Sequence, residues 1–308
     1  MISKSRIGTA ISIALIFSAT FSPLQAAKKR GGGGDHASKG IALAEQKQYD
    51  AAIVEFTKAI EAKPKDPRNY TNRGFAYRAS GRMAEALADF TKATEVDPKD
   101  IIAWNEKART ELMQNQFDLA LADATKATEL KPDDAMGFSL RGFANIGLQQ
   151  WDKAVADFTV AIEKKPEDTQ NYDRRAWANR NLKQFEAAIT DYTFLITKNP
   201  ADAESLVRRG MTYGFMTEYE KAIADYEAAI KLKPEDFDTQ QRLQYARTML
   251  ANKNAPPPAP TPAATPEPAG VITPLNVGIG LGVILIIAVV VRLVTRGKPE
   301  NVSSGRIR

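Results

Sequence analysis

Residues 135–168 read AMGFSLRGFANIGLQQWDKAVADFTVAIEKKPED, and this stretch decides the fold because its pattern recurs along the chain at one fixed period. The period is clearest in the prolines near the end of each copy, which are Pro64, Pro98, Pro132, Pro166, Pro200 and Pro234. An aspartate stands two positions after each proline, at 66, 100, 134, 168, 202 and 236. Proline cannot continue a helix and aspartate caps the start of the next one, so the pattern predicts that one helix ends and another begins in every copy.

Two columns of small residues are shared by the six copies, which span 33–66, 67–100, 101–134, 135–168, 169–202 and 203–236. One column is alanine throughout: Ala52, Ala86, Ala120, Ala154, Ala188 and Ala222. The other lies earlier in each copy: Gly40, Gly74, Ala108, Gly142, Ala176 and Gly210. Only small side chains let two helices approach closely, so we expect the two helices of each copy to cross where these columns meet.

The second helix of each copy also carries a bulky column, one helical turn after the alanines. Its members are Phe56, Phe90, Ala124, Phe158, Tyr192 and Tyr226. Spacings of three and four place such residues on one buried stripe of a helix. This order of small residue, alanine, aromatic and proline, in a unit of about 34 residues, resembles the tetratricopeptide repeat family. The third copy departs from the family pattern, because it has Glu111 and Ala124 where aromatics are preferred.

The resemblance implies an all-α fold, a right-handed α-solenoid of antiparallel helix pairs over residues 33–236. A finite stack needs a solvated end, and residues 237–253 continue as a helical pattern without a second helix after it. We therefore expect a C-terminal capping helix at 237–253.

A basic column faces an acidic column in the aligned copies. The bases are Lys39, Arg73, Lys107, Arg141, Arg175 and Arg209, and the acids are Glu55, Asp89, Asp123, Asp157, Asp191 and Asp225. We predict that each base pairs with an acid on a neighbouring helix. The alternative is a row of arginines that binds phosphate, which an equal row of acids would cancel.

The family resemblance also implies a partner site, because first helices in this family line a concave groove that holds extended peptides or partner helices. Two columns of this chain match groove positions, one being Ile41, Phe75, Arg109, Phe143, Trp177 and Met211, the other Ala44, Arg78, Leu112, Ile146, Arg180 and Gly214. The residues predicted to bind a partner are Phe75, Arg78, Arg109, Phe143, Ile146, Trp177, Arg180 and Met211. Apolar groups interleaved with arginines suit a peptide with aromatic or aliphatic anchors and some acids. The other interpretation is that several of these residues pack between repeats.

Some co-chaperones of this family hold chaperone C-termini with a lysine, asparagine and arginine clamp. The corresponding columns of this chain do not supply that set, so binding of chaperone tails is disfavoured.

The N-terminal segment has the layout of a secretory signal peptide. Residues 1–27 begin with Lys4 and Arg6, continue through an apolar run and end in small residues near Ala26. This predicts export followed by cleavage, with an uncleaved anchor as the alternative. Residues 28–34 form a glycine-rich lead-in that we expect to be flexible.

The C-terminal segments predict a membrane anchor. Residues 254–270 are rich in proline and alanine and should form a semi-rigid linker. Residues 271–294 hold an uncharged run long enough for a transmembrane helix, and the basic tail at 295–308 should stay cytoplasmic. Gly278 and Gly282 could allow two such helices to touch, which gives weak dimerisation.

The two ends together predict a protein of the cell inner membrane, with a single span and with the repeats in the periplasm. The alternative is a tail-anchored adaptor, similar to a co-chaperone, whose repeats lie in the cytosol. That alternative requires residues 1–27 not to act as a leader.

Composition argues against an enzyme and against a metal protein. The chain has 308 residues, a net charge of +5, no cysteine and His36 as its single histidine. No phosphate-binding loop and no combination of nucleophile, base or metal ligands appears, so we expect no catalytic residue, no metal and no cofactor. The modest positive charge does not favour nucleic acid. The sequence therefore predicts a membrane-anchored scaffold that binds a protein or peptide.

Overall fold

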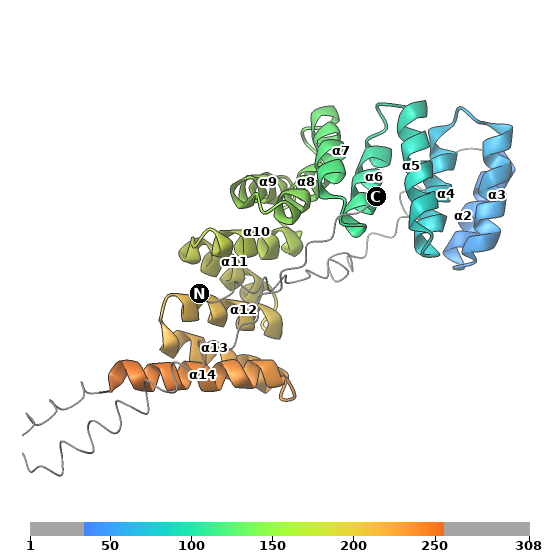
Figure 1. Cartoon of the computed structure of the whole chain (residues 1–308). Coiled ribbons are helices and arrows are strands. Elements are labelled where there is room, and N and C mark those ends of the chain that lie inside the picture. The colour runs from blue at the N-terminus through green and yellow to red at the C-terminus, as the bar shows by residue number, and fades with distance from the viewer. Residues whose placement is uncertain (1–33, 256–308) are drawn as a thin grey trace, which may run out of the picture. The chain divides into compact units, whose positions relative to one another are not determined.

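The computed structural model describes residues 34–255, which contain thirteen α-helices and, within that range, no strand (Figure 1). The helices form consecutive pairs: α2 (Gly34–Glu45) with α3 (Tyr49–Ala62), α4 (Pro67–Ala79) with α5 (Met83–Val96), α6 (Ile101–Met113) with α7 (Phe117–Leu130), α8 (Ala135–Gly147) with α9 (Trp151–Lys164), α10 (Thr169–Asn181) with α11 (Phe185–Lys198), and α12 (Ala203–Phe215) with α13 (Tyr219–Leu232). A single helix, α14 (Phe237–Asn254), follows the last pair. The predicted all-α solenoid of helix pairs is confirmed.

The aspartates after the prolines cap the first helices, as the sequence predicts. Asp100 accepts hydrogen bonds from the backbone N–H groups of Ile102 and Ala103, and Asp66, Asp168, Asp202 and Asp236 accept from backbone N–H groups in the same way. Asp134 is the exception, because its carboxylate accepts instead from Asn105 Nδ2 at 3.0 Å. One cap is thus replaced by a contact between neighbouring repeats.

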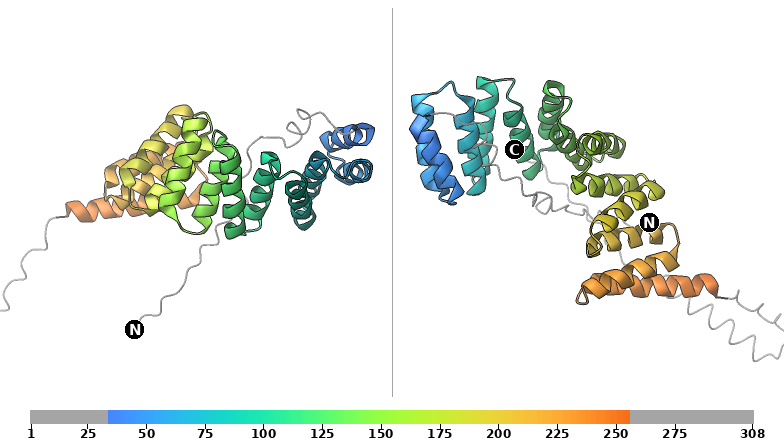
Figure 2. Two further views of the ribbon diagram at one scale, coloured as in Figure 1. Left: turned by 90° about the horizontal axis from the view of Figure 1, so that it is seen from above. Right: turned by 180° about the vertical axis from the view of Figure 1, so that it is seen from behind.

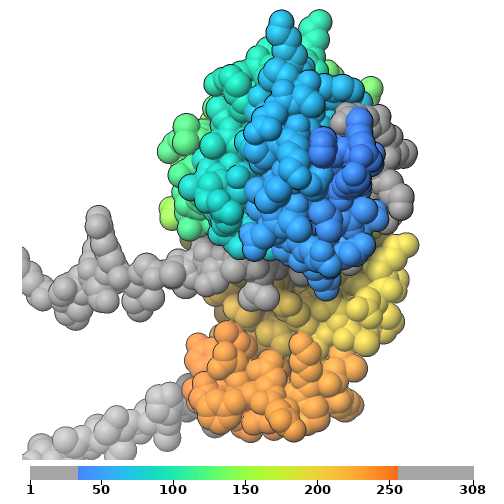
Figure 3. Space-filling model, turned by 90° about the vertical axis from the view of Figure 1, so that its right-hand side faces the viewer, coloured from blue at the N-terminus to red at the C-terminus, as the bar shows by residue number. Residues whose placement is uncertain are grey.

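The pairs stack in chain order, since each helix contacts the next one along the chain (Figures 1 and 2). The first helices of the pairs also contact one another: α2 contacts α4, α4 contacts α6, α6 contacts α8, and α8 contacts α10. The first pair closes one end of the stack, and Figure 3 looks onto this end, with the blue atoms of α2 and α3 toward the viewer. We call the side formed by the first helices and α14 the first-helix face.

Small residues sit where the two helices of a pair cross. The six alanines of the second helices are fully buried, at 0% exposure in each case. Opposite them, a Cβ added to Gly142 would lie 2.9 Å from the ring of Phe158, and Gly40, Gly74 and Gly210 are similarly close to the ring of their own pair. The expectation that these columns allow close approach is confirmed.

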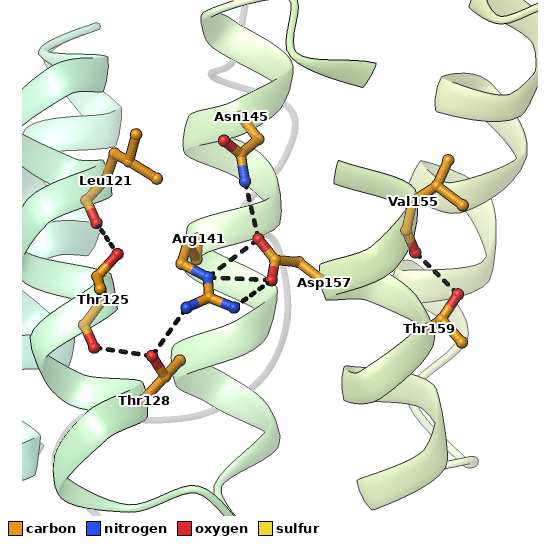
Figure 4. Close-up of polar contacts among 8 residues, drawn as sticks. All are labelled: Leu121, Thr125, Thr128, Arg141, Asn145, Val155, Asp157 and Thr159. Atoms are coloured by element: carbon orange, nitrogen blue, oxygen red, sulfur yellow. Dashed lines mark hydrogen bonds and ion pairs between the residues drawn. The ribbon is translucent and has the colours of Figure 1, made fainter. Parts of the chain in front are cut away.

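We call the series of predicted pairs of a basic with an acidic residue the charge ladder. Wherever its base is an arginine, a step of the ladder joins three helices, and the fourth repeat shows it most fully (Figure 4). Arg141 Nη2 on α8 lies 2.6 Å from Asp157 Oδ1 on α9, and Asn145 Nδ2 donates to Asp157 Oδ2 at 2.8 Å. A second guanidinium nitrogen of Arg141 donates to Thr128 Oγ1 on α7, at 3.1 Å. One arginine therefore fixes its own pair and ties it to the preceding repeat.

Four further predicted pairs form, and one does not. The pairs Arg73–Asp89, Lys107–Asp123, Arg175–Asp191 and Arg209–Asp225 have closest N–O distances between 2.7 and 2.9 Å. The predicted pair of Lys39 and Glu55 is wrong: Lys39 contacts Asp35, and Glu55 contacts His36 and Lys58. In this first repeat, Asp35 and Lys58 lie one turn away on the same helix as Lys39 and Glu55 respectively, and His36 on α2 takes the contact between helices.

The predictions for both ends of the chain lie outside the described residues. These are the signal peptide at 1–27, the lead-in up to residue 33, most of the linker, the transmembrane helix at 271–294, the tail, and the contact of Gly278 with Gly282. Between residues 34 and 255, none of the helices has the length and apolar character needed to cross a bilayer.

Candidate functional site

Three of the predicted groove residues lie in the core rather than on an accessible surface. Phe75, Phe143 and Ile146 are 4%, 7% and 4% exposed. Phe75 meets Phe90 edge-to-face at 5.5 Å between ring centres, and Phe143 meets Phe158 in the same way at 5.3 Å. In this conformation these three side chains hold helix pairs together.

Two of the predicted groove arginines share one carboxylate. Arg78 Nη1 on α4 lies 2.6 Å from Glu106 Oε2 on α6, and Arg109 Nε lies 3.5 Å from the same oxygen. Burial acts to raise the pKa of Glu106, but the positive charges of Arg78 and Arg109 outweigh burial and hold that pKa below its usual range. An acidic ligand would have to compete with Glu106 for these arginines.

The other predicted groove residues are half-buried and lie in the last two repeats. Trp177 meets Trp151 edge-to-face at 5.2 Å, and Met211 packs against the buried cluster that contains Tyr219 and Tyr226. Arg180 Nη1 is buried and has no hydrogen-bond acceptor among the described residues. Trp177, Arg180 and Met211 therefore remain the predicted residues that a partner could reach or engage.

A charged cluster on α10 and α12 was missed by sequence reasoning. Arg208 forms ion pairs with Asp173 and with Glu204, and Arg174 Nε lies 3.6 Å from Asp173. The guanidinium of Arg174 also lies over the ring of Phe143, at 5.7 Å. The signal was present, because Arg174, Arg208 and Arg242 are separated by the repeat period and form a column of their own.

A cavity of about 480 Å³ opens between α12, α13 and α14. Its apolar lining includes Met211, Phe215, Tyr219 and Tyr226. The polar lining residues Asp238, Gln241 and Arg242 come from α14, together with Tyr245. Gly214 also lines it, and a Cβ added there would meet no atom within 4 Å. Sequence analysis placed Met211 and Gly214 in groove columns but did not predict the cavity.

The third repeat buries a carboxyl group where the family prefers an aromatic. Glu111 is 2% exposed and lies beside Asp123, the acid of the charge ladder. Burial, together with the negative charge of Asp123, raises the pKa of Glu111 to about 8. In the next repeat the same position is Asn145, which donates to Asp157 without adding a charge. Over residues 34–255 no group of three acidic or histidine side chains is arranged to hold a metal ion.

Family models match three parts of the stack. A model described as TPR repeat matches residues 40–81, and two described as Tetratricopeptide repeat match residues 67–100 and 203–236. These segments are tetratricopeptide repeats. Such repeats are in general modules that bind proteins or peptides rather than enzymes.

A curated relative matches a short part of the chain. It is Tetratricopeptide repeat protein 36 of Caenorhabditis elegans, which is 55% identical over 40 residues. That match covers 13% of this chain and 22% of the relative, so it spans about a fifth of that protein.

Solved structures share the fold over a larger part. YrrB, described as a TPR protein with an unusual peptide-binding site, is 22% identical with a TM-score of 0.55, covering 63% of this chain and 97% of YrrB. A fragment of MamA from Desulfovibrio magneticus is 20% identical with a TM-score of 0.51, covering 56% of this chain and 99% of the fragment. At these identities the likeness is one of fold.

Proposed function

We propose that this chain is a scaffold that holds an extended peptide or a helix of another protein against its first-helix face. The observation that carries the proposal is the position of Trp177 and Met211. They occupy the same repeat position on successive first helices and are half-buried, so each keeps apolar surface in reach of a partner. Similarity to YrrB supports a peptide as the ligand, because that protein is described as having a peptide-binding site.

We propose further that the scaffold is exported and anchored. Residues 1–27 would direct the repeats to the periplasm, residues 271–294 would hold them at the inner membrane, and the linker at 254–270 would set them at a distance from the lipid. The charge pattern supports this orientation, because five basic residues follow the apolar run and Glu300 is the single acid among them.

Binding is tested by crosslinking and co-purification from membranes with the full chain. Trp177→Ala and Met211→Ala should each reduce recovery of a partner that the unaltered chain captures. Leu119 supplies the control, because it is an exposed apolar residue on the second helix α7 and so lies outside the first-helix face; Leu119→Ala should leave recovery unchanged. Equal recovery with all three variants would exclude this face as the binding surface.

Orientation is tested separately, by adding protease to each side of the membrane and by sequencing the mature N-terminus. Digestion of the repeats from the periplasmic side alone, with an N-terminus near Ala27, supports export. Digestion from the cytosolic side alone, with Met1 retained, would support the tail-anchored adaptor instead.

A further inference from the structure

A missing side chain creates the cavity between α12 and α14. In earlier repeats the position of Gly214 is held by Ala44, Arg78, Leu112, Ile146 and Arg180, so each of the other repeats has a side chain there. Leu112 and Ile146 are 1% and 4% exposed, so they fill the corresponding space in their own repeats. Gly214 fills nothing, since a Cβ there would have no neighbour within 4 Å.

The walls and the mouth of this cavity are aromatic. Tyr219 and Tyr226 are buried within it, whereas Phe215 and Tyr245 are 59% and 64% exposed. By the repeat spacing, Tyr245 is the next member of the groove column after Met211, so it continues that column onto α14. Exposed aromatic side chains around an apolar cavity are suited to hold an aromatic or aliphatic anchor.

Arg242 lines the cavity and has no acidic partner among the described residues. Arg208, its counterpart one repeat earlier, pairs with Asp173, but the residue in the position of Asp173 one repeat later is Val207. Arg242 is exposed and forms no ion pair with any described residue, although Asp238 lies one turn before it on α14. The guanidinium is therefore available to a carboxylate from outside the chain.

We propose that this cavity binds a peptide of another protein, with an aromatic or large aliphatic side chain inside it and an aspartate or glutamate side chain of the same peptide paired with Arg242. This inference rests on the proposed function and narrows it, from the whole first-helix face to its α12–α14 end.

The test is selection of linear peptides displayed on phage against the immobilised full-length chain, followed by affinity measurement with synthetic peptides that are amidated at the C-terminus. Enriched peptides should combine an aromatic or large aliphatic residue with a nearby acid. Gly214→Ile fills the cavity with the side chain that Ile146 has in the fourth repeat, so it should weaken binding by about tenfold or more. Arg242→Gln should weaken binding by about two- to fivefold. This loss should be smaller at high salt, because salt screens the ion pair in the unaltered chain.

Controls separate this inference from the proposed function. Gly214→Ile should unfold at the same temperature as the unaltered chain or at a higher one, because isoleucine has a higher helix propensity than glycine and a Cβ at this position meets no atom within 4 Å. Peptides that bind Gly214→Ile at full strength but lose affinity with Trp177→Ala would overturn the inference and leave the proposed function standing. If no peptide is enriched, both the inference and the proposed function are overturned. If peptides bind equally well with their acidic residue replaced by an uncharged one, Arg242 has no role in binding.

Discussion

The first-helix face differs between the second to fourth repeats and the α12–α14 end. In the former, Phe75, Phe143 and Ile146 are buried, and Arg78 and Arg109 share the carboxylate of Glu106. In the latter, Gly214 leaves a cavity of about 480 Å³ and Arg242 has no acidic partner among the described residues. The same columns of the repeat therefore hold the stack together in one region, and in the other they leave a cavity beside an arginine that has no acidic partner among the described residues.

The two regions differ in the neighbours that their side chains contact, and not in how their helices are paired. Both regions share the crossing of small residues and the charge ladder, since the closest N–O distances in Arg141–Asp157 and Arg209–Asp225 are 2.6 and 2.7 Å. Two features change: Gly214 replaces a larger residue, and Arg242 lacks an acidic partner such as the one that Glu106 provides for Arg78. We call the second to fourth repeats the filled region and the α12–α14 end the open region. Substitutions of buried residues in the filled region should lower stability, and substitutions at the cavity of the open region should weaken binding.

The largest effect is expected from Phe143→Ala in the filled region. Removing this buried ring, which packs on Phe158 and lies under Arg174, should lower the free energy of unfolding by about 3–5 kcal/mol. Denaturation by urea measures it. Phe237→Ala, at a 65% exposed aromatic of the open region, should change stability by about 0.5 kcal/mol or less. Similar losses in the two variants would contradict the division into filled and open regions.

A pH-dependent effect is expected at Glu111. Because its pKa in the folded chain, about 8, exceeds the ordinary value of 4.5, the stability that protonated Glu111 contributes is present below pH 4.5 and is lost as the pH rises to about 8. Glu111→Gln should therefore stabilise the chain at pH 8, by about 1–3 kcal/mol, and much less at pH 5. Unfolding measured at both pH values tests this.

Glu129 provides the control for that experiment, since it is an exposed carboxylate of the same repeat. Glu129→Gln should have the same small effect at both pH values. A gain from Glu111→Gln that did not depend on pH would show that the buried carboxyl is ionised throughout this range.

A pair of glycines compares the two regions directly. Gly142→Ala places a methyl group 2.9 Å from the ring of Phe158 and should cost about 1–3 kcal/mol. Gly214→Ala places it in open space and should stabilise the helix by about 0.5–1 kcal/mol. Opposite signs in thermal unfolding are the expected result. Destabilisation by both substitutions would mean that the space beside Gly214 is filled in solution.

The smallest difference is expected in the charge ladder. Double-mutant cycles on Arg141 with Asp157 and on Arg209 with Asp225 should give similar coupling energies, of about 1–2 kcal/mol, since both acids are buried. The exposed pair of Lys92 and Glu95 should give about 0.5 kcal/mol or less. Unequal coupling in the two buried pairs would show that the regions differ in more than the first-helix face.

Much of the fold was predictable because it depends on contacts that recur in every copy. Proline and aspartate fixed the helix ends, and the small columns fixed where helices cross. The ladder followed from two charged columns that keep the same separation in each repeat. The pair of Lys39 and Glu55 does not form, because each has a partner on its own helix and Glu55 also pairs with His36 on α2. The cap failed at Asp134, where Asn105 reaches across repeats.

The candidate site was less predictable because accessibility depends on residues outside the aligned groove columns. Nothing in the column of Phe75 and Phe143 shows that both rings are covered, and Glu106 belongs to a column that is otherwise not acidic. The cavity needs Gly214 and also the placement of α14 beside it. The aligned sequence shows that Gly214 has no side chain, but it does not show that the space beside Gly214 stays empty.

The most direct test is hydrogen–deuterium exchange of the full-length chain with and without an amidated peptide obtained by selection. Slower exchange is expected in α12 and α14, with exchange in α4, α6 and α8 unchanged by the peptide. Protection confined to α4, α6 and α8 would contradict the account, because it would place the ligand on the region in which the side chains are buried and paired.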